Sequence, residues 1–201
     1  MKKLFLGSVA ALVAGPAFAH HPMGGQTPAS LAEGLLSGIG HPILGLDHLA
    51  FVLAVGIAAV LAGRRFALPL VFVGATLAGT LLHLAAIGLP LAEWAIAFSV
   101  AAIGLMLASG RSFGTLVYGV LFATAGVFHG FAYGEAIFGA ETTPVLAYLV
   151  GFGATQYAIA VLAGTAIVGA ARAVPARVAG GMVAGAGLFI FGEKVIATAF
   201  A

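Results

Sequence analysis

The sequence predicts an all-α bundle of six transmembrane helices that follow a cleaved signal peptide. The first reason is composition: 62% of the 201 residues are apolar and 7% are charged, with a mean hydropathy of +1.18. A soluble domain carries roughly a quarter charged residues and could not bury so much apolar surface. The second reason is that the apolar residues form six runs, each near the roughly 20 residues that span a bilayer.

The first 19 residues have the pattern of a secretory signal. Lys2 and Lys3 precede a short apolar run, and Ala17-Phe18-Ala19 fits the small-x-small cleavage rule. Cleavage after Ala19 would leave a periplasmic segment at 20–40. Ser30-x-x-Glu33 in that segment has the spacing of a capping box, which predicts a short interfacial helix before the transmembrane domain at 41–201.

Arginines set the predicted orientation. The six spans are 41–62, 67–88, 90–109, 113–139, 144–171 and 178–198, and alternate loops between them carry Arg64, Arg65, Arg111, Arg172 and Arg177. By the positive-inside rule those loops are cytoplasmic. A signal peptide places the N-terminus outside, in agreement with this. The sequence therefore predicts a bacterial inner-membrane protein whose mature N- and C-termini are both periplasmic.

Composition also excludes several functions. The chain has no cysteine, so disulfides, thiolate metal sites and thiol nucleophiles are excluded. Loss of the two signal-peptide lysines would leave six basic and six acidic residues, which gives no support for nucleic-acid binding. Small residues let membrane helices pack closely, so we expect glycines such as Gly74, Gly79 and the Gly181/Gly185 pair to serve packing.

Ionisable side chains within the spans all fall in the predicted outer half of the membrane. Such residues are costly in lipid and point to function. Their placement predicts a polar cavity that opens to the periplasm. The set is His41, Asp47, His48, His83, Glu93, His129, Glu135, Glu193 and Lys194.

The densest group is His41, Asp47 and His48. On a regular helix, the two histidines would lie about 10 Å apart, so they could share one ion only if the helix unwound at Gly45. Pro42 suits the first turn of the predicted span. Imidazole and carboxylate groups without thiolate suit Ni²⁺, Co²⁺, Zn²⁺ or Cu²⁺, or else a proton relay.

Each candidate also has a structural interpretation. His83 could bond between helices, Glu93 could reach water, and Glu193 could neutralise Lys194. Gln156 favours interhelical packing, and Trp94 and Tyr148 favour an aromatic belt. The mature N-terminus, His20-His21, is either a metal-capture arm or a mobile tail.

The string His41-Pro42-x-x-Gly45-x-Asp47-His48, with Gly56 further on, resembles the signature of the HupE/UreJ family of bacterial nickel and cobalt permeases. The segment 128–135, Phe-His-Gly-Phe-Ala-Tyr-Gly-Glu, is similar to that family's second motif. The resemblance implies that His41, Asp47 and His48 recognise the metal, with His129 and Glu135 as further ligands and His83 and Glu93 on the pathway. Val52 and Tyr133 stand where the family often has Met and His.

The predicted function is therefore secondary uptake of Ni²⁺ or Co²⁺ as a transported ligand, with no permanent cofactor. The partners are the metal ion and the lipid bilayer, and a homo-oligomer is possible. The alternative is a non-transporting metal-binding or sensor protein that assists maturation of a hydrogenase or urease. No Walker, H-E-x-x-H or G-x-S-x-G motif occurs, so we expect neither an ATPase nor another enzyme.

Overall fold

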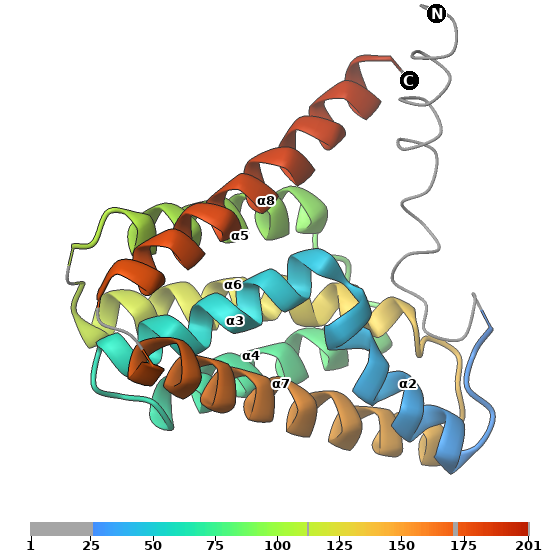
Figure 1. Ribbon diagram of the computed structural model, residues 1–201. Helices are drawn as coiled ribbons and strands as arrows, with labels where there is room; N and C mark the ends of the chain where they lie inside the picture. The colour runs from blue at the N-terminus through green and yellow to red at the C-terminus, as the bar shows by residue number, and fades with distance from the viewer. Residues whose placement is uncertain (1–25, 112, 171–172, 201) are drawn as a thin grey trace, which may run out of the picture.

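The computed structural model describes residues 26–111, 113–170 and 173–200, and this part of the chain is helical throughout apart from its connections. The predicted signal peptide and the His20-His21 arm lie outside the described residues. Figure 1 shows the helices, which are α2 (Leu31–Leu44), α3 (Leu46–Leu61), α4 (Ala67–Leu84), α5 (Ala92–Ala108), α6 (Thr115–Glu135), α7 (Thr142–Ala170) and α8 (Ala173–Ala199). The all-α prediction is confirmed.

The predicted capping box starts α2. The Ser30 hydroxyl accepts a bond from the Glu33 backbone N–H, and the Glu33 carboxylate accepts one from the N–H of Ala29. The helix extends beyond the predicted short interfacial helix at 20–40 and continues to Leu44. Pro42 therefore lies in the last turn of α2 and not in the first turn of a span, which corrects the prediction.

The chain breaks at Gly45, between α2 and α3. Gly45 is extended, with φ −77° and ψ 106°, and the two helices meet at an angle of 78°. Proline at 42 removes one backbone donor from the helix just before the break. The predicted first span at 41–62 is thus not one straight helix; α2 and α3 form a broken span or a re-entrant loop.

The predicted number of six spans is not confirmed by the described residues. Four helices are long and apolar enough to cross a membrane: α4, α6, α7 and α8. The bent α2–α3 pair makes a fifth if it counts as one span. α5 is apolar but has only 17 residues, about 26 Å of helix against a hydrocarbon core of about 30 Å.

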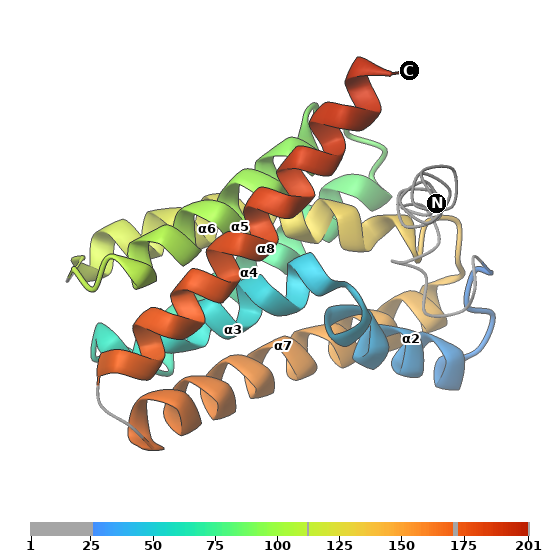
Figure 2. The same cartoon turned by 45° about the horizontal axis from the view of Figure 1, so that its top comes forward.

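α3 forms the centre of the bundle. Ten of its sixteen residues are buried, and the main apolar core gathers around Phe51 and Val55. Figures 1 and 2 show α5 and α8 side by side over one face of α3, while α7 runs along another face with α2 against its first half. α4 packs lengthwise on α6.

Glycines bring these helix pairs into close contact. A Cβ on Gly130 of α6 would lie 1.9 Å from the Thr76 carbonyl oxygen of α4, and one on Gly104 of α5 would lie 2.2 Å from the Ala184 nitrogen of α8. No side chain fits at either position. The predicted Gly181/Gly185 pair faces open space instead, so that packing prediction is wrong.

Candidate metal site

Three histidines from three helices lie in one buried row. His41 ends α2, His48 begins α3 and His129 comes from the second half of α6. The ring centroids of His41 and His48 are 5.7 Å apart, and those of His48 and His129 are 5.0 Å apart. The break at Gly45 brings the first two together, which a continuous helix would not allow.

Hydrogen bonds fix which nitrogen of His48 carries the proton. The Ser99 hydroxyl donates to the Ile96 carbonyl at 2.7 Å, so toward His129 Nε2, at 3.0 Å, it can only accept. Neutral His129 then carries its proton on Nε2 and accepts at Nδ1. His48 Nδ1, 2.8 Å away, must be the donor. The lone pair of His48 is therefore on Nε2.

The same argument applies to His41. The Tyr148 hydroxyl donates to the Tyr133 carbonyl at 2.9 Å, so it accepts from His41 Nδ1 at 2.7 Å. Neutral His41 likewise carries its lone pair on Nε2. Metal-binding histidines usually donate their other ring N–H to an oxygen acceptor in this way, because that bond fixes the tautomer and the ring orientation.

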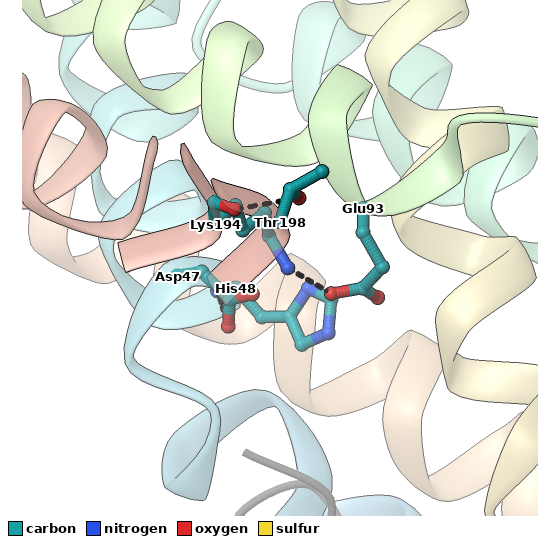
Figure 3. A network of polar contacts seen from close by, with 5 residues as sticks. All are labelled: Asp47, His48, Glu93, Lys194 and Thr198. Carbon is teal, nitrogen blue, oxygen red and sulfur yellow. Dashed lines mark hydrogen bonds and ion pairs between the residues drawn. The ribbon is translucent and has the colours of Figure 1, made fainter. Parts of the chain in front are cut away.

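Asp47 lies beside these imidazoles at the start of α3. Its Oδ1 accepts the backbone N–H of His48 at 2.8 Å, and the side chain is 8% exposed. Figure 3 shows Asp47 and His48 together with an ion pair between Lys194 of α8 and Glu93 of α5, whose N–O distance is 2.5 Å. The ion pair corrects the prediction that Lys194 is neutralised by its neighbour Glu193.

Tyr133 is the aromatic centre of the cluster. Its ring stacks on His48 with centroids 4.3 Å apart and meets His41 edge-on at 4.6 Å. Its hydroxyl is buried and has no hydrogen-bond partner among the described residues, and the same holds for the hydroxyl of Ser37, one turn before His41 on α2. Buried polar atoms without partners are uncommon, so the cluster has polar capacity that the protein itself does not fill.

Phenylalanine rings pack against His129. The ring centroid of Phe51 lies 4.5 Å from that of His129, 5.3 Å from that of Phe72 and 6.2 Å from that of Phe122. All three are fully buried. Phe51, Phe72 and Phe122 therefore form an apolar cluster beside His129.

The cluster is closed in this conformation. His41 and His48 are each 1% exposed and His129 is fully buried, so the predicted open cavity is not present around them. Among the described residues, no three His, Asp or Glu side chains already surround one point as metal ligands would. An ion would therefore need these side chains to turn toward it.

Comparison with known proteins identifies the chain. The family described as HupE / UreJ protein matches residues 8–190. The chain is also 35% identical over 192 residues to Protein HupE of Rhizobium leguminosarum bv. viciae, covering 93% of this chain and 97% of that protein.

The chain belongs to the HupE/UreJ family. The family is associated with nickel and cobalt handling for hydrogenase and urease, and it is a metal transport or accessory family rather than an enzyme family. No solved structure matches the chain.

In this HupE/UreJ protein, only part of the predicted ligand set is brought together. His41, Asp47, His48 and His129 gather as described. Of the other predicted residues, Glu135 is exposed at the end of α6, and Glu93 is half exposed and paired with Lys194. His83 packs between Phe131 and Phe138, with its Nδ1 buried and unbonded among the described residues.

Three residues of the site were not predicted as such. Tyr148 was assigned to the aromatic belt, but it is fully buried and holds His41. Tyr133, noted only as a departure from the HupE/UreJ pattern, stacks on His48. Ser99, which bonds to His129, was not singled out in the sequence at all. A search of the sequence for hydroxyl partners of the buried histidines could have pointed to Ser99 and Tyr148.

Proposed function

We propose that the protein carries Ni²⁺ or Co²⁺ into a bacterial cell across its inner membrane, with His41, Asp47 and His48 as the recognition site. The observation that supports this is the matched pair of histidine tautomers. Both Nδ1 atoms bond to protein groups, so the lone pair of each neutral ring is on Nε2, the nitrogen that we propose ligates the ion. Two neutral imidazoles and a carboxylate suit Ni²⁺ and Co²⁺.

Entry is from the end of the bundle that carries the carboxylates. All six acidic residues lie near helix ends. Asp47 and Glu93 are in the first turns of α3 and α5, and Glu33 is in the first turn of α2. Glu135 ends α6, Glu193 is in the last third of α8, and Glu141 directly precedes α7. A negative mouth concentrates divalent cations. By the positive-inside rule the opposite, arginine-bearing end is cytoplasmic, which gives periplasmic termini.

Binding replaces part of the water shell of the ion. His41 and His48 supply nitrogen, Asp47 supplies charge, and the unfilled hydroxyls of Tyr133 and Ser37 can bond to water that stays on the metal. His129 holds His48 in its ligating tautomer. It becomes a ligand itself once the bond between their Nδ1 atoms opens.

Passage inward requires movement, because Phe51, Phe72 and Phe122 fill the space below His129. The break at Gly45 is the natural hinge, since α2 and α3 already meet there at 78° and so can change their angle without unwinding a helix. No nucleotide-binding motif is present in the sequence, so transport is secondary or depends on a partner.

The test is uptake of radioactive Ni²⁺ and Co²⁺ into proteoliposomes that contain the purified chain. Asp47→Asn and His48→Ala should each abolish saturable uptake. Ser109→Ala, an exposed hydroxyl at the other end of the bundle, is the matched control for expression and reconstitution and should transport normally. The ratio of the two initial rates gives the metal preference.

Two results would overturn the proposal. Tight metal binding without flux would establish the non-transporting binding or accessory role. Flux that is indifferent to both substitutions would place the pathway elsewhere in the chain.

A further inference from the structure

A second cluster of polar groups lies at the arginine-bearing end of the bundle, far along α3 from the histidines. There the ends of α3 and α5 meet the starts of α6 and α8 around a pocket of about 230 Å³. The residues that line it are Leu61, Ala62, Leu107, Gly110, Arg111, Phe113, Tyr118, Ala176 and Arg177. A water molecule occupies about 30 Å³ in the liquid, so the pocket has room for a group of several heavy atoms.

Two guanidinium groups give this pocket its charge. Arg177 is held in place by a bond from its Nε to the Ala108 carbonyl oxygen, at 3.3 Å, which leaves its terminal nitrogens for another acceptor. Gly110 makes room for it: φ is +64°, and a Cβ there would lie 2.9 Å from Arg177 Nε. Arg111, the next residue, supplies the second charge to the same pocket.

No carboxylate is near enough in sequence to neutralise them. The segments 48–92, 94–134 and 142–192, which contain both arginines and every wall of the pocket, have no Asp or Glu at all. In the described ranges neither guanidinium forms an ion pair; the ion pair found there joins Lys194 to Glu93. Paired arginines without a protein anion are the donor set that recognises phosphate oxygens.

The rest of the pocket is apolar. Leu61, Leu107 and Phe113 line it together with the nearly buried Tyr118. Basic pockets between membrane helices, with charge at the rim and hydrocarbon below, suit an anion that has an apolar part.

We propose that this arginine pocket binds a phosphate-bearing anion. The phosphate would sit between Arg111 and Arg177, and its source is either the headgroup of an anionic phospholipid at that membrane surface or phosphate in solution. The site is independent of the metal-transport proposal.

The experiment measures the melting temperature of the full chain in phosphatidylcholine nanodiscs, because a ligand that binds only the folded state raises it. One arm adds phosphatidylglycerol to the discs. The other adds inorganic phosphate, with chloride adjusted to hold ionic strength constant. A rise in the first arm alone identifies the lipid source, and a rise in both identifies phosphate itself.

Arg111→Gln and Arg177→Gln should each lower the apparent affinity about tenfold and so reduce that rise at a given ligand concentration. Arg65→Gln removes the same charge from the same end but lies outside the pocket, so it should keep the rise. Arg111 is exposed, and its variant carries the test if Arg177→Gln fails to fold. No rise in either arm, or an equal reduction by all three substitutions, would overturn the proposal in favour of a diffuse basic surface.

Discussion

The Nδ1 atoms of His48 and His129 lie 2.8 Å apart, so a single proton serves both nitrogens. The Ser99 hydroxyl, 30 residues before His129 in the chain, decides on which ring that proton resides. By its bond to His129, this hydroxyl sets which nitrogen of His48 carries the lone pair.

Ser99→Ala should weaken metal binding through this chain of bonds. Without the Ser99 acceptor, the proton of His129 is no longer held at Nε2 and can move to Nδ1. The proton of His48 is then forced onto its Nε2, which removes the lone pair from that nitrogen. Loss of a bond that orients a metal-binding histidine costs about 10- to 100-fold in affinity. Calorimetric Ni²⁺ titration of the full chain in nanodiscs measures this, with Ser109→Ala as control. Unchanged affinity in Ser99→Ala would contradict the tautomer assignment.

Tyr148→Phe should act in the same way on His41. The substitution removes the acceptor of His41 Nδ1–H and also the donor to the Tyr133 carbonyl. We expect affinity to fall about tenfold and stability to fall by about 1–3 kcal/mol from buried groups left unpaired. Tyr157→Phe, on the same helix but outside the cluster, is the control. Equal behaviour of the two variants in titration and thermal melts would argue against a role for Tyr148.

Acidification should stop metal uptake. A protonated imidazole has no lone pair, so the ligating form of His41 and His48 is the one present at higher pH, and uptake falls as the pH drops through the histidine range, from about 7.5 to 5.5. Proteoliposomes with equal internal and external pH separate this effect from any proton gradient. Constant initial rates across that interval would exclude histidine ligation as the entry step.

Gly130→Ala should disrupt the bundle, because its Cβ would meet the Thr76 carbonyl at 1.9 Å. Overpacking against backbone costs about 1–3 kcal/mol or more. Gly181→Ala places the same methyl group in open space and should be neutral or slightly stabilising through helix propensity. The yield of folded protein and the melting temperature report the difference; a normal melt for Gly130→Ala would mean that α4 and α6 are farther apart than described.

The sequence was most informative where a local rule was sufficient. Apolar composition predicted the helical membrane bundle, and Ser30 with Glu33 predicted the start of α2. The spacing of His41 and His48 also indicated that the two histidines could share one ion only if the helix unwound at Gly45. Backbone preference and side-chain period act over a few residues, so they can be predicted from the printed sequence.

Contacts between distant residues were not predictable in that way. Tyr148 reaches His41 across 107 residues, and Lys194 prefers Glu93 across 101 residues to its own neighbour. The predicted depth in the membrane placed these four residues near one level. It carried no information on how far each helix is rotated about its own axis. Rotation is set by the glycine contacts between helices, which also explains why Gly180 and Gly187 pack on α5 whereas Gly181 faces outward.

The phenylalanine cluster beside His129 determines what kind of kinetics the proposed transport can have. An ion that had a continuous watery path would pass by diffusion, and its flux would rise in proportion to concentration. In the proposed pathway each ion waits for Phe51 and its two neighbours to part, a collective motion of microseconds to milliseconds. The proposed transport should therefore be that of a carrier, with saturable turnover limited to between about a thousand and about a million ions per second by such a motion, and with a steep slowing on cooling.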